Sequence, residues 1–160
     1  KRTRMQAELE IQRATTLTST PSDEQFQHWV SAVPSDLEHT VQLSIRIVDE
    51  PEAQRFNRDY RKKDYATNVL SFPVDLPAGL PSDVRKSQLG DLLICAPVVV
   101  REALEGRRSE ADHWAHLTIH GVLHLLGYDH EQDAEAVKME SIETKTLESL
   151  GISDPYKDRM

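Results

Sequence analysis

Residues 109–130 read SEADHWAHLTIHGVLHLLGYDH, and they predict the helix around which the rest of the chain packs. Ser109, followed three positions later by Asp112, forms a capping box, which marks the start of a helix. The apolar residues that follow supply enough surface to bury this helix against a core. Gly127 should end it, because glycine adopts the left-handed backbone conformation without steric cost.

Five of the chain's seven histidines lie in this stretch, and four share one face of the predicted helix, since residues three and four apart stack on one another. At about 1.5 Å of rise per residue, His116 and His124 begin about 12 Å apart and cannot share one metal ion. One pair spaced by four, His120 and His124, can do so. A chain turned back at Gly127 brings His130 to this pair. The spacing HxxxHxxGxxH therefore predicts a metal site with three histidine ligands and an open fourth position, which is the catalytic kind.

The spacing equals that of the metzincin protease signature, HExxHxxGxxH, with one difference. Gly121 stands where those proteases have the glutamate that acts as general base for the attacking water. Since glycine cannot accept a proton, the residues that predict the metal site also disfavour peptidase chemistry.

Two further histidines of the helix, His113 and His116, are predicted to be core residues, and they can also hydrogen-bond a metal-binding histidine. His116 and Asp129 are the candidates for such a positioning role. An aspartate beside His130 is equally explained as a turn residue.

Composition limits the class of protein. A chain of 160 residues, 38% hydrophobic and 29% charged, predicts one domain, residues 1–160, with a sizeable core. The apolar runs are too short or interrupted to span a bilayer, and no secretory signal is evident. The single cysteine, Cys95, excludes an internal disulfide and is expected to be a buried thiol. These features predict a cytoplasmic protein.

The net charge of −8 argues mildly against a general nucleic-acid binder, because phosphate contacts supply most non-specific affinity. The charge is unevenly spread, with acids concentrated in residues 131–148. We call the opposite concentration the basic cluster: Arg55, Arg58, Arg61, Lys62 and Lys63. An acidic protein can bind a polyanion at such a cluster. The cluster is equally well explained as the solvent-exposed face of a helix with no binding role.

The rest of the chain predicts strands interleaved with helices. The expected strands are 5–14, at a sheet edge, 41–47, 68–73 and 89–95, and the expected helices are 22–33, 49–61, 97–107, 109–127 and 133–150. This order predicts an α/β or α+β fold, in which a small mixed sheet of about four strands packs with about five helices and the histidine helix is central.

Three blocks of sequence stand out beyond the single motif: YRKKD at 60–64 with TNVLSFP at 67–73, LGDL at 89–92, and HGVLHLLGYDH at 120–130. In this order and spacing they resemble the YbeY family of bacterial endoribonucleases, from about residue 7 to Tyr156. Ala66 stands where proline is common in the family, Asn68 stands where aspartate is frequent, and the loop 74–88 is long. None of these differences touches a predicted ligand.

The resemblance implies a zinc-dependent endoribonuclease specific for single-stranded RNA. It implies a role in ribosomal RNA maturation, notably at the 3′ end of the small-subunit RNA, and in ribosome quality control. Its partners would be RNA and the small ribosomal subunit, with no membrane and no DNA expected. It implies one Zn²⁺ per chain on His120, His124 and His130, with Arg61 as the catalytic residue beside it. The candidates for substrate binding are Arg58, Lys62, Lys63, Asn68 and Ser71.

A three-histidine zinc leaves a position for water or for a phosphate oxygen, and Arg61 would stabilise charge on the non-bridging oxygens. Nickel is not excluded, since imidazole suits both metals, and the nucleophile can be water or the RNA 2′-OH. One rival function is a metallopeptidase or other small-molecule metallohydrolase. The other is a non-catalytic ribosome-binding factor with structural zinc, although structural zinc normally has four protein ligands and the motif offers three.

Overall fold

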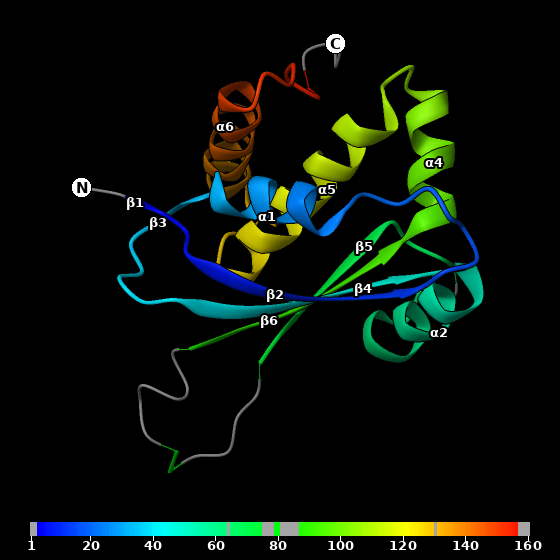
Figure 1. Cartoon of the computed structure of the whole chain (residues 1–160), viewed down its shortest axis with the longest axis horizontal. Coiled ribbons are helices and arrows are strands. Elements are labelled where there is room, and N and C mark those ends of the chain that lie inside the picture. Colours follow the sequence, from blue (N-terminus) through cyan, green and yellow to red (C-terminus); the bar gives the residue numbers. More distant parts are fainter. Residues whose placement is uncertain (1–2, 64, 75–78, 81–86, 130, 157–160) are drawn as a thin grey trace.

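The computed structural model describes residues 3–63, 65–74, 79–80, 87–129 and 131–156, and it packs helices on a mixed sheet (Figure 1). The strands of this sheet are β2 (Ala7–Ala14), β4 (Val41–Val48), β5 (Val69–Pro73) and β6 (Gln88–Cys95). They lie in the order β2-β4-β6-β5; β2, β4 and β6 are parallel, and β5 runs antiparallel to β6. The predicted four-stranded mixed sheet, with its first strand at an edge, is confirmed.

The helices are α1 (Asp23–Ser31), α2 (Glu50–Arg61), α4 (Ala96–Glu105), α5 (Glu110–Leu125) and α6 (Asp133–Ser149). The bounds of these helices and of the sheet strands agree with the sequence predictions to within two residues. A short antiparallel pair, β1 (Thr3–Arg4) with β3 (Pro34–Ser35), was not predicted, because two-residue strands carry no periodicity.

The sheet is covered on both faces. In Figure 1, α1, α5 and α6 lie on one side of it and α2 lies on the other. The side chains of β6 alternate accordingly: Leu92 and Ile94 belong to the main core under α5, while Leu93 and Cys95 belong to a smaller cluster under α2. This explains why β6 is apolar throughout, as a central strand should be. Cys95 is 1% exposed, so the predicted buried thiol is confirmed.

Helix α5 is the central element, in contact with α1, α4, α6, β5 and β6. Its start is capped as predicted, since the Ser109 side chain accepts a hydrogen bond of 3.0 Å from the backbone N–H of Asp112. Its end is followed by Gly127 at φ 103°, the left-handed conformation expected there. The main core cluster contains residues from Met5 to Ile152. That residues 1–160 form a single domain stays a prediction.

Two glycines let α5 lie close against the sheet. A Cβ atom added to Gly121 would lie 2.7 Å from Cδ2 of Leu92 on β6. A Cβ atom on Gly90, where φ is +146°, would lie 2.6 Å from the backbone oxygen of Phe72 and 2.8 Å from Cδ2 of Leu125. The helix that carries the histidines is therefore seated on β5 and β6 at a distance that side chains at these positions would not permit. Among the described helices, none is long and apolar enough to cross a membrane.

Candidate active site

A cleft of about 740 Å³ opens beside the C-terminal half of α5. Its walls come from the end of α2, the strand β5, the helix α5 and the turn that follows α5. Six residues predicted for the site line it together: Arg61, Asn68, Ser71, His120, His124 and Asp129. His130, the predicted third ligand, lies outside the described residues. The fold thus brings blocks that are distant in sequence to a single cavity.

His120 and His124 face each other, with their Nε2 atoms 3.0 Å apart. The i, i+4 spacing in α5 places the two rings one above the other, as the sequence predicted. Two imidazole nitrogens bound to one tetrahedral zinc, each at 2.0–2.1 Å, lie about 3.3 Å apart. The pair therefore has nearly the separation of two ligands of one ion.

The opposite nitrogens of both rings are hydrogen-bonded. His120 Nδ1 contacts the Glu143 carboxylate, and His124 Nδ1 lies 3.1 Å from the backbone oxygen of Tyr128. Both partners accept hydrogen bonds, so in the neutral rings each Nδ1 is the donor and each Nε2 presents a lone pair to the other ring. Two lone pairs at this separation repel, and a cation between them removes the repulsion. This donor set fits a metal ion bound through both Nε2 atoms.

Glu143 was not among the predicted site residues. It is completely buried on α6, and its Oε2 accepts a hydrogen bond of 2.5 Å from the hydroxyl of Tyr156 and lies 3.4 Å from His116 Nε2. Burial alone would raise the pKa of this carboxyl, but hydrogen bonds from His116, His120 and Tyr156 outweigh burial and hold the pKa at about 2. The signal in the sequence was a glutamate that shares helical spacing with the buried Met139 and Leu147.

His116 lies where the sequence placed it, on the same face of α5 and mostly buried. Burial lowers the pKa of its imidazole, and its Nδ1 lies 3.4 Å from Nη1 of Arg108. His116, His120 and Glu143 offer ligand atoms that all lie within 4.8 Å of one another, a group that could hold a metal ion. This group uses the Nδ1 side of His120, whereas the pair with His124 uses the Nε2 side, so His120 is common to both arrangements.

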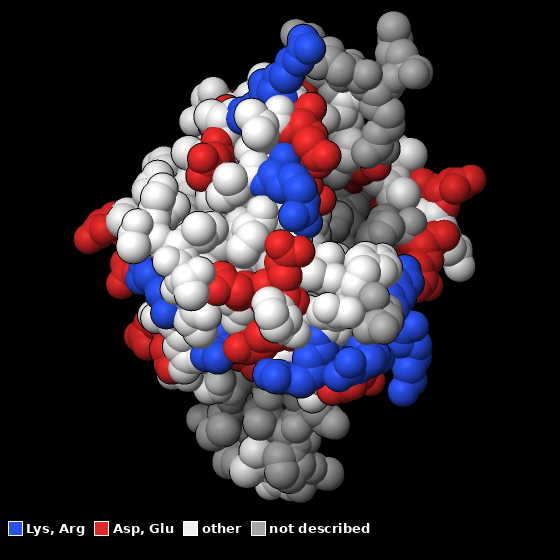
Figure 2. Space-filling view, turned by 90° about the vertical axis from the view of Figure 1, so that its right-hand side faces the viewer, with Lys and Arg blue, Asp and Glu red and all other residues white. Residues whose placement is uncertain are grey.

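Arg61 is the last residue of α2, and its side chain is exposed at the rim of the cleft. Figure 2 views the face that includes α2 and shows Lys and Arg side chains in a band, with acidic side chains among them. The other residues of the basic cluster are also exposed, and they lie outside the cleft lining. The catalytic role of Arg61 and the substrate contacts of Arg58, Lys62 and Lys63 stay predictions.

Two other predicted substrate contacts also tie β5 to its neighbours. The Asn68 amide donates a hydrogen bond of 3.0 Å to Glu102 of α4, and the Ser71 hydroxyl donates one of 3.1 Å to the backbone oxygen of Gly121. Asp129 accepts a hydrogen bond of 3.1 Å from the backbone N–H of Glu131, which is the turn contact considered for it. The roles of Asn68 and Ser71 in substrate binding, and of Asp129 in positioning, stay predictions.

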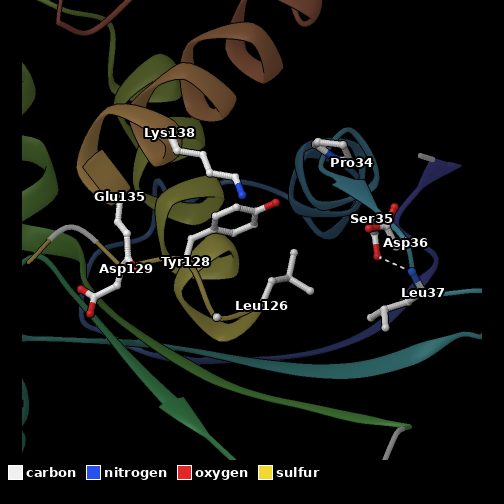
Figure 3. Close-up of a pocket in the computed structure, with 10 residues that line it drawn as sticks. Pro34, Ser35, Asp36, Leu37, Leu126, Tyr128, Asp129, Glu135 and Lys138 are labelled. Atoms are coloured by element: carbon white, nitrogen blue, oxygen red, sulfur yellow. Dashed lines mark hydrogen bonds between the residues drawn. The ribbon is translucent and has the colours of Figure 1, made fainter. Parts of the chain in front are cut away.

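A second cavity, of about 380 Å³, lies on the other side of the turn at residues 127–129. Figure 3 shows it between Tyr128 and the segment from Pro34 to Leu37, with Lys138 extended toward the Tyr128 ring. The Lys138 Nζ lies 5.8 Å from the centroid of that ring. None of the described histidines lines this cavity, whereas His120 and His124 both line the larger cleft.

The chain is similar over most of its length to proteins of one family. The family model described as Endoribonuclease YbeY matches residues 8–151. A protein of this name from Halorhodospira halophila is 52% identical over 141 residues, which are 88% of this chain and 91% of the relative. The one from Stenotrophomonas maltophilia is 56% identical over 136 residues, which are 85% of this chain and 84% of the relative. The solution structure of TM1509 from Thermotoga maritima shares the fold, with a TM-score of 0.51, 21% identity, and coverage of 94% of this chain and 97% of that one.

Proposed function

Because this chain belongs to the endoribonuclease YbeY family, as its three sequence blocks predicted, it is an endoribonuclease, and we propose that it hydrolyses single-stranded RNA with a zinc ion on His120, His124 and His130. The observation that carries the proposal is the pair of Nε2 atoms 3.0 Å apart at the cleft, each on a ring whose Nδ1 proton is already engaged. His130 completes the ligand set through the spacing of the motif.

In this proposal zinc supplies Lewis-acid polarisation of the scissile phosphate, or a bound water of lowered pKa. The residues of the chain do the rest. Arg61, at the rim of the same cleft, places a permanent positive charge and two or more N–H donors beside the phosphate. These donors stabilise the negative charge that develops on the non-bridging oxygens in the transition state.

Single-strand specificity has support in the aromatic residues beside Arg61. The Tyr60 ring lines the cleft, is 65% exposed, and lies parallel to Phe56 with 5.8 Å between ring centroids. Phe72 packs edge-on to Tyr60 at 5.1 Å. An exposed ring held by other aromatic residues and flanked by arginine can stack on an unpaired base, which a base inside a duplex does not offer.

We further propose that the substrate is ribosomal RNA in the cytoplasm, at the 3′ end of the small-subunit RNA, with the small ribosomal subunit as partner. The support is the family resemblance of the three sequence blocks. The basic cluster offers a surface for the phosphates of such an RNA on an otherwise acidic protein.

The two rival functions lose support from the structure. A metallopeptidase of the metzincin type needs a glutamate at position 121, but the space beside Gly121 is filled by Leu92. A structural zinc site is closed by four protein ligands, whereas His120 and His124 line an open cleft.

The test combines metal analysis with cleavage of a single-stranded RNA, with and without a chelator, by the wild type and His124→Ala. We expect one zinc per chain in the wild type, cleavage that chelator abolishes and zinc restores, and neither metal nor cleavage in His124→Ala. A duplex RNA and casein serve as the alternative substrates. Cleavage of casein, or RNA cleavage that survives complete removal of the metal, would contradict the proposal.

A further inference from the structure

Glu143 is the centre of a hydrogen-bond network behind His120. Its side chain is 0% exposed, and its two oxygens contact three different side chains. Oε1 accepts a hydrogen bond from Nδ1 of His120, and Oε2 accepts one from Tyr156. A buried carboxylate is costly unless hydrogen bonds replace its hydration, so an apolar residue would fill this position on α6 more simply.

The network is anchored at its outer end as well. The backbone N–H of Tyr156 donates a hydrogen bond of 2.8 Å to Asp154, which also accepts one of 3.3 Å from Thr144 of α6. On the other side of Glu143, His116 lies 3.4 Å from Arg108. These contacts hold the carboxylate between α5, α6 and the segment after α6, and leave it little freedom to turn.

We propose that Glu143 is the positioning residue of the metal centre. Its carboxylate holds the proton of His120 on Nδ1 and thereby directs Nε2 toward His124 and the cleft, while Tyr156 and His116 hold the carboxylate. Hydrogen bonds of this kind fix the tautomer and ring orientation of metal-binding histidines and raise their basicity. The inference rests on the proposed function, since it takes Nε2 of His120 as a metal ligand.

The contacts favour positioning over direct ligation by Glu143. Two atoms bound to the same zinc at 2.0–2.2 Å lie about 3 Å or more apart. Oε1 and Nδ1 of His120 are in hydrogen-bond contact instead, and Oε2 is only 2.5 Å from the Tyr156 hydroxyl. The group is also buried, with 13% exposure for His116 and 0% for Glu143, whereas the Nε2 side of His120 faces the cleft that substrate enters.

A second carboxylate–histidine contact, to another histidine of α5, supplies a control. Glu102 of α4 is paired with His113 of α5 at 2.9 Å. His113 is seven residues before His120, which separates it from the proposed metal centre by about 10 Å along the helix. The pair of variants Glu143→Gln and Glu102→Gln therefore removes the same charge from the same kind of contact, and only one of the two contacts involves a proposed ligand.

The experiment measures the zinc dissociation constant of the full chain by competition with a chromophoric chelator. We expect Glu143→Gln to bind zinc about 10- to 100-fold more weakly than the wild type, and Glu102→Gln to bind it equally tightly. The absorption bands of the cobalt-substituted proteins should show the same number and type of ligands in the wild type and in Glu143→Gln. Equal zinc affinity of Glu143→Gln and the wild type, or loss of an oxygen ligand in Glu143→Gln, would overturn the assignment.

Circular dichroism establishes that each variant is folded. If Glu143→Gln does not fold, Tyr156→Phe tests the same network by removing one hydroxyl, and a smaller weakening of zinc binding is expected. Wild-type affinity in Tyr156→Phe would then overturn the inference. His120→Ala separates the two proposals: zinc binding that survives this change refutes the metal centre itself. Zinc binding that requires His120 but is unchanged in Glu143→Gln refutes only the positioning role.

Discussion

Replacing Gly90 with alanine tests whether the close contact between α5 and the sheet determines the stability of the fold. Gly90 has φ +146°, a conformation that is strained for residues with a side chain and costs about 1–3 kcal/mol. The new Cβ would also lie 2.6 Å from the backbone oxygen of Phe72 and 2.8 Å from Cδ2 of Leu125. Overpacking of this kind costs about 1–3 kcal/mol. The structure can relax little around the new Cβ, because its nearest neighbour is a backbone atom of Phe72 and not the end of a flexible side chain.

A less flexible unfolded chain offsets about 0.4–1 kcal/mol of this cost. The net loss expected in the free energy of unfolding is therefore about 1–6 kcal/mol. Gly151 supplies the control, since it also has a positive φ, of +80°, but among the described residues no heavy atom beyond its chain neighbours lies within 4 Å of its added Cβ. Gly151→Ala should lose only about 0–1.5 kcal/mol, from backbone strain alone.

The assay is urea unfolding of both variants and the wild type in the presence of a chelator, so that metal binding does not contribute to stability. The midpoint should fall much further for Gly90→Ala than for Gly151→Ala, with unchanged m values. Because Leu125 follows His124, Gly90→Ala should also weaken zinc binding in the metal-loaded protein. Equal stability of Gly90→Ala and Gly151→Ala would refute the reasoning that close approach to β6 constrains α5.

Three further predictions concern the cleft and its surroundings. Arg61→Ala should lower the rate of RNA cleavage by about 10²- to 10³-fold while elemental analysis finds the metal content unchanged; a normal cleavage rate would exclude the assigned role. Burial raises the pKa of the Cys95 thiol to about 11, so at pH 8 the thiol stays protonated and should react with a thiol-specific dye only after unfolding; fast reaction of the native protein would contradict this. Gly121→Glu completes the protease signature, but the new side chain would collide with Leu92, so we expect the variant to be less stable in urea and not to hydrolyse casein. Hydrolysis of casein would show that the glycine alone prevents peptidase chemistry.

The positions of helices and strands were predictable because their signals are local. The cap at Ser109, the positive φ at Gly127 and the alternation in residues 41–47 each act within a few residues along the chain. The pairing of His120 with His124 was predictable for the same reason, since four residues in a helix always bring two side chains together. The bounds of α4 show the limit of such signals, because the helix stops at Glu105 rather than at 107.

Tertiary structure decided which distant segments meet, because contacts between elements depend on how their buried faces pack and not on local spacing. Only the folded chain places β6 between β4 and β5, puts α2 on the opposite face of the sheet from α5, and brings Arg61 to the same cleft as the histidines. It also joins Glu143, 23 positions after His120, to that histidine. The sequence by itself determined that α5 brings His120 and His124 together, and packing between α5 and α6 decided which partner the His120 ring has on its opposite side.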